Sequence, residues 1–214
     1  MIRILLVDDH DLFRAGVSSI LRNQEDMVVV GEFADGEQAI RAVREEAPDL
    51  VLMDVNMPGI GGIEATRKIL QIAPQVKIIA VTVLSDDPFP NQLLDAGARG
   101  YISKGSGSEE MIEAIKMVMR GHYYISSDVA QKLTLANFRS GGEASPVSKL
   151  TARETQVMMM ITRGQSTQAI SDALFLSPKT VSTYRHRLFE KLDVTNDVEL
   201  THFAIRHGLL ETSQ

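Results

Sequence analysis

The sequence predicts a doubly wound α/β domain with a five-stranded parallel sheet, followed by a smaller all-α domain. Two observations carry this prediction. Short β-branched runs alternate with stretches of helical spacing over residues 1–121, whereas only helical spacing is present over 148–214. Between them, residues 139–146 hold glycines, serines and a proline, which is the composition of a linker. We therefore expect domains at 1–121 and 148–214, joined by a linker over 122–147.

The strands of the first domain are predicted at five runs, and its helices at the stretches between them. The runs are Arg3–Val7, Met27–Gly31, Leu50–Asp54, Lys77–Val83 and Gly100–Ser103. Leu50–Met53 and Ile78–Val81 are continuously apolar, as strands buried on both faces of a sheet are. Strands that alternate with helices in this way pair in parallel, with helices on both faces of the sheet.

The second domain is predicted to contain four helices, preceded by a connecting helix over Ser127–Phe138 in the linker. The four are Ser148–Arg163, Thr167–Leu174, Pro178–Leu192 and Asp197–His207. Thr151 and Glu154 have the spacing of a capping box, which marks the start of the first helix. Ser177 and Pro178 place an N-cap hydroxyl directly before a proline, which marks the start of the third.

Composition and charge exclude several classes of protein. The 214 residues include no cysteine, so disulfide scaffolds and thiolate metal sites are excluded. No run approaches the roughly 20 apolar residues of a membrane helix, and we expect a cytoplasmic protein. The formal charge of −6 is uneven: residues 1–121 hold 12 Lys and Arg against 19 Asp and Glu, whereas residues 146–214 hold 8 against 7. A nucleic-acid partner therefore stays open to the second domain.

Polar residues stand at the predicted strand ends, where a doubly wound sheet carries its chemistry. Asp8 and Asp9 follow the first strand, and Asp54 ends the third. Three carboxylates in one crevice repel each other unless a cation compensates, and oxygen ligands favour a hard ion such as Mg²⁺. A carboxylate neutralised in this way can attack a phosphoryl group, whose oxygens Thr82 and Lys104 could hold. One Asp at a strand end is usually a loop or cap residue, so the prediction rests on the whole set.

Four motifs together resemble the receiver domain of two-component response regulators, over about residues 1–121. They are Val7-Asp8-Asp9-His10, Asp54-Val55-Asn56-Met57-Pro58-Gly59, Val81-Thr82 and Gly100-Tyr101-Ile102-Ser103-Lys104. The resemblance implies a flavodoxin-like fold in which Asp54 accepts a phosphoryl group from the histidine of a sensor kinase. It implies Mg²⁺ ligands at Asp8 or Asp9, at Asp54 and at the backbone carbonyl of Asn56, with Asp9 favoured over Asp8.

The same resemblance implies a switch pair, Thr82 and Tyr101, in which the hydroxyl moves to the phosphoryl group and the aromatic ring swings inward. Lys104 would hold the phosphoryl oxygens. One residue departs from the family pattern, because Gly105 stands where many receivers have a proline, commonly after a cis peptide bond. That departure leaves the geometry of the loop open. We expect His10 at a helix start or at the rim of the pocket, and not as a catalytic base.

The predicted helix Pro178–Leu192 has an apolar stripe and an opposite polar surface. The stripe, with 3-4-4 spacing, consists of Val181, Tyr184, Leu188 and Leu192. The polar surface carries Ser182, Thr183, His186 and Arg187, with Lys179 at the N-terminal end. Such a face suits the major groove of DNA, but an ordinary amphipathic helix with solvated charges has the same pattern. The periodicity alone leaves both interpretations open.

Three further motifs resemble the LuxR-type helix-turn-helix domain, over about residues 148–212. They are Leu150-Thr151-Ala152-Arg153-Glu154, Ile170-Ser171-Asp172-Ala173-Leu174, and Ser177-Pro178-Lys179-Thr180-Val181 with Lys191-Leu192. The resemblance implies that two sets of side chains contact DNA. Nearest the bases would be Ser182, Thr183 and His186, and at the phosphates Lys179, Thr180, Arg187 and Lys191. It also implies that Val198–His207 is a dimerisation helix, so that a homodimer binds two promoter half-sites.

A receiver joined to a LuxR-type domain is similar to the NarL/FixJ family of response regulators. Within that family, Asn56–Gly62, Ser177–Val181 and Val198–Leu209 resemble the GacA/UvrY/VarA branch. This resemblance implies a BarA/GacS-like hybrid sensor histidine kinase as the partner. It also implies that the regulated promoters drive small RNAs that sequester an RNA-binding translational repressor of the CsrA kind.

Three other functions are consistent with parts of the sequence. Asp54-Val55-Asn56 also fits the nucleophile of a phosphatase, but Asn56 cannot transfer the proton that such an enzyme needs, so we expect no enzyme beyond slow autodephosphorylation. A LuxR-type regulator gated by a small molecule would need an enclosed apolar pocket in place of the acidic crevice. A receiver that acts through protein contacts alone, with a degenerate helical domain, would not shift DNA in a gel at low salt.

Overall fold

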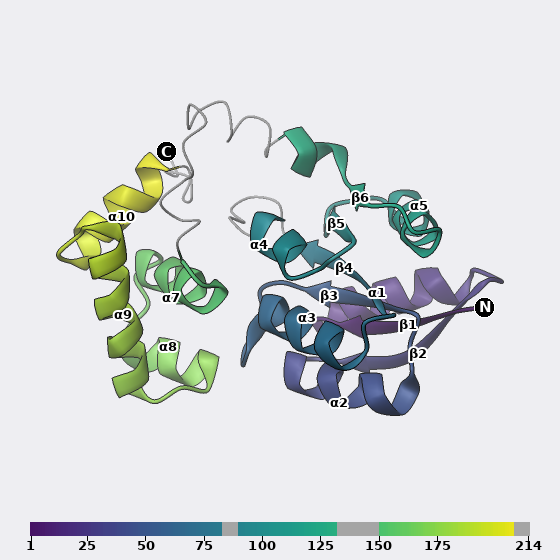
Figure 1. Ribbon diagram of the computed structural model, residues 1–214, viewed down its shortest axis with the longest axis horizontal. Coiled ribbons are helices and arrows are strands. Elements are labelled where there is room, and N and C mark those ends of the chain that lie inside the picture. The colour runs from purple at the N-terminus through teal and green to yellow at the C-terminus, as the bar shows by residue number, and fades with distance from the viewer. Residues whose placement is uncertain (83–89, 132–149, 208–214) are drawn as a thin grey trace. The chain divides into compact units, whose positions relative to one another are not determined.

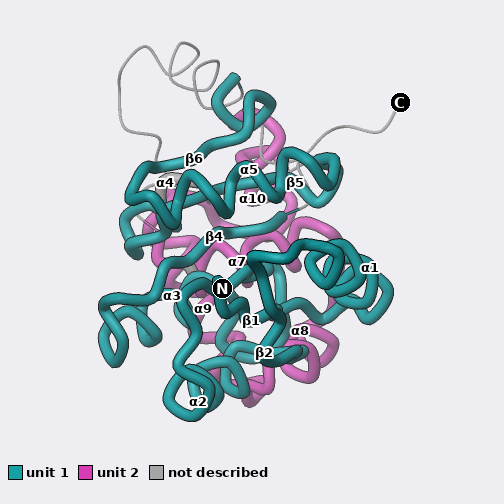
Figure 2. Tube along the Cα trace, turned by 90° about the vertical axis from the view of Figure 1, so that its right-hand side faces the viewer, with its two compact units in different colours: residues 1–84, 90–134 teal, residues 85–89, 135–214 magenta. Residues whose placement is uncertain are grey.

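The computed structural model describes residues 1–82, 90–131 and 150–207, which fall into two compact units (Figure 1, Figure 2). Residues 1–82 and 90–131 belong to an α/β unit, and residues 150–207 to a helical one. Residues 127–131 are helical, at the start of the predicted connecting helix. The rest of that helix and the glycine-rich stretch 139–146 lie outside the described residues. Over the described part of the chain, we find no helix with the length and apolar character needed to span a membrane.

The α/β unit is a six-stranded parallel sheet covered by helices. Its strands are β1 (Ile2–Val7), β2 (Met27–Phe33), β3 (Leu50–Asp54), β4 (Lys77–Thr82), β5 (Gly100–Ser103) and β6 (Tyr124–Ile125), and its helices are α1 (Asp11–Arg22), α2 (Gly36–Glu46), α3 (Gly61–Ile72), α4 (Pro90–Asp95) and α5 (Ser108–Met119). The strand order is β2-β1-β3-β4-β5-β6, and every neighbouring pair is parallel. The doubly wound class is confirmed. The edge strand β6 was not predicted, because two residues carry no detectable periodicity.

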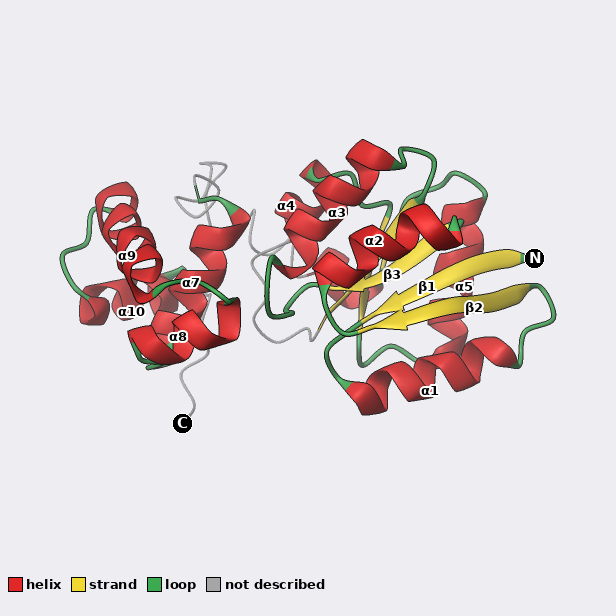
Figure 3. Ribbon diagram, turned by 90° about the horizontal axis from the view of Figure 1, so that it is seen from below, coloured by secondary structure: helices red, strands yellow, loops and turns green. Residues whose placement is uncertain are grey.

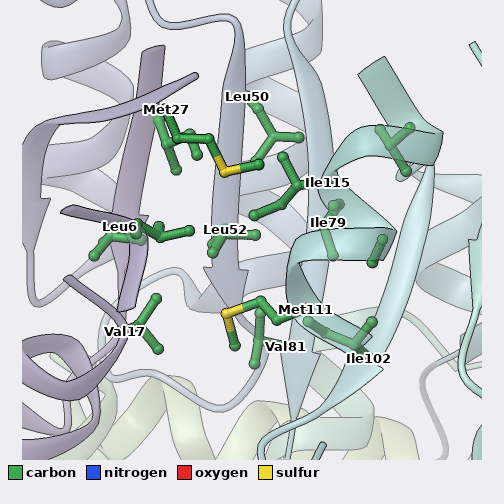
Figure 4. Close-up of a cluster of buried hydrophobic side chains, with 14 residues drawn as sticks. Leu6, Val17, Met27, Leu50, Leu52, Ile79, Val81, Ile102, Met111 and Ile115 are labelled. Carbon is green, nitrogen blue, oxygen red and sulfur yellow. The ribbon is translucent and has the colours of Figure 1, made fainter. Parts of the chain in front are cut away.

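Both faces of the sheet are buried, since successive strand residues point to opposite sides and helices cover each side (Figure 3). On one face Leu6 of β1 packs with Val17 of α1 and Ile115 of α5 (Figure 4). On the other face Leu5 of β1 belongs to a cluster that includes Ala39 of α2. Parallel pairing under two helical layers brings the carboxyl ends of β1, β3, β4 and β5 to one edge.

The helical unit consists, within residues 150–207, of α7 (Ala152–Thr162), α8 (Thr167–Leu174), α9 (Pro178–Leu192) and α10 (Asp197–Arg206). The four predicted helices are confirmed, with α7 beginning at Ala152 because Thr151 caps it. Glu154 N–H donates to Thr151 Oγ1 at 3.3 Å and Thr151 N–H donates to Glu154 Oε2 at 2.8 Å, which is the predicted capping box. All four helices contribute to one core, which includes Val157, Ile170, Val181, Leu188 and Leu200.

Candidate functional site

Four strand ends bring the predicted acidic and basic residues together at one edge of the sheet. Asp8 follows β1 and Asp54 ends β3, and they are only 3% and 2% exposed. Lys104 follows β5, and its Nζ lies 2.7 Å from Asp8 Oδ2 and 2.9 Å from Asp54 Oδ2. Thr82 is buried at the end of β4, where its carbonyl accepts a hydrogen bond from Lys104 N–H at 2.6 Å. Two buried carboxylates therefore share the ammonium group of Lys104, whose side chain is 11% exposed.

Asp9 and His10 extend this cluster toward solvent. His10 Nδ1 lies 2.8 Å from Asp9 Oδ1, 3.1 Å from Asp8 Oδ1 and 4.0 Å from Asp54 Oδ2. One ligand atom from each of the four residues lies within 4.8 Å of the others. His10 is the N-cap residue of α1 and is exposed, as expected for a helix start at the pocket rim, but its ring also reaches the carboxylates.

A tight connection to α3 holds Asp54 in place. Gly59 has a φ of 73°, in the left-handed region that favours glycine. Gly62 packs so closely on the end of β3 that a Cβ there would overlap the backbone oxygen of Asp54. Within this loop the N–H of Asn56 donates to Asp54 Oδ1 at 3.2 Å, while Lys104 Nζ donates to Oδ2. Each carboxylate oxygen of Asp54 therefore has its own donor, one from the adjacent loop and one from the end of β5.

The electrostatic environment of Asp54 disfavours its negative charge when no metal is bound. Its pKa is raised to about 6, first because the carboxyl is buried and second because Asp8 is negative, and Lys104 and the Asn56 N–H offset part of the rise. Additional positive charge would favour the ionised, nucleophilic form. The donors at hand are the carboxylates of Asp8, Asp9 and Asp54, which suit a hard divalent cation. The donor chemistry thus fits the predicted metal site.

Tyr101 and the loop at Gly105 refine two of the sequence expectations. Tyr101 lies in β5 and is 1% exposed, so its ring is already inside the domain in this conformation. The predicted inward swing would therefore require a second conformation with the ring outside. The loop that follows Lys104 contains no cis peptide bond, nor does any other described residue. Gly105 N–H donates to Ser103 Oγ at 3.0 Å, which closes the loop without proline.

Two residues of α1 also belong to the site, although sequence reasoning missed them. The Phe13 ring lies 5.0 Å from Lys104 Nζ, in cation–π geometry. The Arg14 guanidinium donates to the backbone carbonyl of Asp8. Phe13 and Arg14 follow His10 by three and four residues, so all three lie on one side of the first helical turn. This spacing could have indicated that they belong to the site. Contact with Lys104 depends on how α1 crosses the sheet, which helical spacing does not reveal.

The polar surface of α9 is arranged as its periodicity predicted. Val181, Leu188 and Leu192 are buried and Tyr184 packs against the same core. The exposed residues are Lys179, Ser182, Thr183, His186 and Arg187. Thr180 is less exposed, and its hydroxyl lies 2.8 Å from Ser177 Oγ at the helix start. An exposed row of hydrogen-bonding and cationic side chains is what major-groove contact requires, and the individual contacts with DNA stay predictions.

Lys191 differs from the other predicted phosphate contacts. Its Nζ lies 2.7 Å from Oε2 of the buried Glu154, which completes the capping box of α7 with Thr151. Burial raises the pKa of Glu154, but hydrogen bonds from Lys191 and Thr151 outweigh this effect and lower it below its usual value. Lys191 therefore contributes to the packing of α9 on α7, and its proposed contact with DNA would have to compete with this pair.

Arg185, which sequence reasoning did not single out, joins α9 to two other helices. Its Nε donates to Asp197 Oδ1 at 2.7 Å, and its Nη1 donates to Thr167 Oγ1 at 3.3 Å. Asp197 begins α10, the helix for which dimerisation is predicted, and Val198 and Ile205 of this helix are exposed apolar side chains. Exposed apolar side chains suit a contact surface, and the dimer itself stays a prediction.

Comparison with known proteins adds independent information on both units. Residues 4–116 match the response regulator receiver domain, and residues 148–204 match the bacterial regulatory proteins of the luxR family. The chain is 52% identical to the response regulator GacA of Pseudomonas viridiflava over 213 residues, covering all of both chains. It is 51% identical to the response regulator UvrY of Escherichia coli K12, covering 98% of this chain and 96% of UvrY. The crystal structure of the response regulator ChrA of a heme-sensing two-component system is 29% identical with a TM-score of 0.55, covering 98% of each chain.

Proposed function

Because this chain belongs to the two-component response regulators that join a receiver domain to a LuxR-type DNA-binding domain, we propose that phosphorylation of Asp54 controls its binding to DNA. The Asp54 carboxylate attacks the phosphorus of a phosphohistidine on a sensor kinase. An acyl phosphate forms as the P–N bond breaks, and the electron pair of that bond returns to the histidine nitrogen. The observation that carries the proposal is the buried Asp54 carboxylate, which lies beside Asp8 and within 2.9 Å of Lys104.

Each neighbouring side chain has a role in this transfer. Asp8, Asp9, Asp54 and the Asn56 carbonyl would hold Mg²⁺, which supplies positive charge that offsets the carboxylates and the phosphoryl oxygens. Lys104 passes from the carboxylates to a phosphoryl oxygen, and the Thr82 hydroxyl holds another, while Tyr101 responds to the movement of Thr82. Asn56 cannot transfer a proton to a leaving group, so the protein is a phosphoacceptor and not a phosphomonoesterase.

We assign DNA binding to the polar surface of α9. Residues 146–214 hold 8 Lys and Arg against 7 Asp and Glu, so the long-range field that attracts DNA is weak. A homodimer formed through α10 compensates, because two half-sites combine two weak contacts. The similarity to GacA and UvrY supports a BarA/GacS-like hybrid kinase as the partner and promoters of small regulatory RNAs as targets, within the cytoplasm.

Phosphorylation by acetyl phosphate tests the first half of this function. Full-length protein, the Asp54→Ala variant and the Asp26→Ala variant are incubated with Mg²⁺ and acetyl phosphate and run on a phosphate-affinity gel. Asp26 is the matched control, because it is an exposed Asp whose carboxylate pairs with Lys116 and with no residue of the site. We expect a shifted band for wild type and Asp26→Ala, none for Asp54→Ala, and none when EDTA removes the metal. An unshifted wild type beside a working control regulator would contradict the assignment.

A gel shift on promoter DNA tests the second half. Phosphorylated full-length protein is expected to bind more tightly than the unphosphorylated form, because phosphorylation shifts the population toward a binding-competent arrangement. If the unphosphorylated receiver hinders binding, the fragment 146–214 binds more tightly than the unphosphorylated full chain. Equal affinities of this fragment and the unphosphorylated chain would exclude inhibition by the receiver.

A further inference from the structure

The imidazole of His10 lies among the carboxylates that the proposed function assigns to the metal. Ligand atoms bound to one ion at about 2.1 Å lie about 3 Å apart when adjacent and about 4.2 Å apart when opposite. His10 Nδ1 lies 2.8 Å from Asp9 Oδ1, 3.1 Å from Asp8 Oδ1 and 4.0 Å from Asp54 Oδ2. The nitrogen therefore lies at the separations expected of one more ligand of the same ion.

A positive charge already lies between three of these groups. Lys104 Nζ is 2.7 Å from Asp8 Oδ2, 2.9 Å from Asp54 Oδ2 and 3.3 Å from His10 Nδ1. In the tautomer that carries its proton on Nε2, His10 turns the lone pair of Nδ1 toward Lys104 and toward the carboxylate oxygens. A metal ion among these atoms would then bind the lone pairs of both His10 Nδ1 and Asp9 Oδ1.

The backbone fixes the position from which this ring reaches the cluster. His10 N–H donates to Asp8 Oδ1 at 2.8 Å, and His10 is the N-cap residue of α1. The ring itself is 62% exposed, which leaves it room to adjust to the coordination distance of an ion. Asp8 thus positions the histidine through the backbone, while one side of the ring stays open to solvent.

We propose that His10 Nδ1 is a ligand of the divalent ion in this receiver and raises its affinity for Mn²⁺ relative to Mg²⁺. Mg²⁺ prefers oxygen ligands, whereas divalent transition metals accept imidazole nitrogen and bind mixed nitrogen and oxygen sites more tightly. The inference rests on the proposed function for the existence of the metal site. It goes beyond that function by naming a nitrogen ligand and its consequence for the choice of metal.

Manganese binding to the full-length protein tests this ligand directly. Free Mn²⁺ is followed by electron paramagnetic resonance during titration, Mg²⁺ affinity is obtained by competition, and pulsed measurements on bound Mn²⁺ detect a coordinated nitrogen. The variants are His10→Ala and His122→Ala, the control being an exposed histidine beyond the end of α5. We expect the nitrogen signal in wild type and His122→Ala but not in His10→Ala. Mn²⁺ affinity should fall about tenfold in His10→Ala, while Mg²⁺ affinity changes less than about twofold.

The outcomes separate this inference from the proposed function. Mn²⁺ binding without a nitrogen signal in wild type, or an equal loss of Mn²⁺ and Mg²⁺ affinity in His10→Ala, would overturn the role of His10. The metal site would still stand if Asp9→Ala abolished binding of both ions. A wild-type protein that bound neither ion would overturn the metal site and the role of His10 together.

Discussion

The two functional regions of this chain use charge in opposite ways. In the receiver, Asp8 and Asp54 are buried and share contacts with Lys104, whose side chain is 11% exposed. On α9 most of the side chains predicted to contact DNA are exposed, and the His186 side chain is 77% exposed. Burial strengthens each electrostatic interaction and makes an unpaired charge costly, whereas solvent screens exposed charges. We therefore expect single substitutions to change the receiver strongly and the DNA-binding surface weakly.

The largest effect on stability is expected for Lys104→Met. This change leaves the carboxylates of Asp8 and Asp54 buried without their shared cation, and breaking a buried pair costs about 3–5 kcal/mol. The free energy of unfolding, measured in urea at pH 7.5 with EDTA, should fall by this amount, and added Mg²⁺ should recover part of it. If Lys104→Met were as stable as wild type without metal, the cluster would not be buried as the structure has it.

Asp54→Asn is expected to stabilise the metal-free protein, in a way that depends on pH. The folded pKa of Asp54 is about 6 and its usual value is 3.8, so ionisation at neutral pH weakens the fold. Two pKa units correspond to at most about 3 kcal/mol. The advantage of Asp54→Asn should be small below pH 4 and should grow until pH 6, as measured by urea unfolding in EDTA. Mg²⁺ should reverse this stability advantage, because only the wild type keeps the Asp54 carboxylate that would bind the ion. A difference independent of pH would contradict the raised pKa.

In the DNA-binding domain, Glu154→Ala should cost about 2 kcal/mol, because it removes both the capping box and the partner of Lys191. Glu154→Gln keeps the cap and should cost about half as much. The pKa of Glu154 is lowered, so its contribution is present above pH 4.5 and is lost as the pH falls through the folded pKa. Glu190→Gln, on the exposed side of α9, is the control and should change the unfolding free energy little. Equal costs for Glu154→Ala and Glu190→Gln would remove the distinction between buried and exposed pairs.

The smallest effect is expected for Arg187→Ala on DNA affinity. One screened phosphate contact should change affinity by only a few-fold and lower the slope of log affinity against log salt by about 1 for each half-site. Arg120→Ala removes the same charge from the receiver and should leave both quantities unchanged. Filter binding at several salt concentrations measures them. A loss as large for Arg120→Ala would mean that net charge, and not a contact from α9, governs affinity.

Local sequence patterns determined most of the architecture. Strand and helix periodicity predicted β1 to β5 and α7 to α10 along the chain, and the strand ends identified Asp8, Asp54, Thr82 and Lys104 as neighbours. The cap formed by Thr151 and Glu154 was visible as a spacing of three residues. Each of these features depends on residues close together in the chain, or on the rule that parallel strands end at one edge.

Only the tertiary structure decided which side chains meet across elements. Lys191 pairs with Glu154 and Arg185 with Asp197, and each pair joins two different helices. The burial of Tyr101 likewise depends on how helices and loops cover β5. The place of the His10 ring among the carboxylates also depends on where α1 lies over the sheet. Helix packing angles and side-chain rotamers set such contacts, and periodicity carries information about which face of an element is buried but not about its partner.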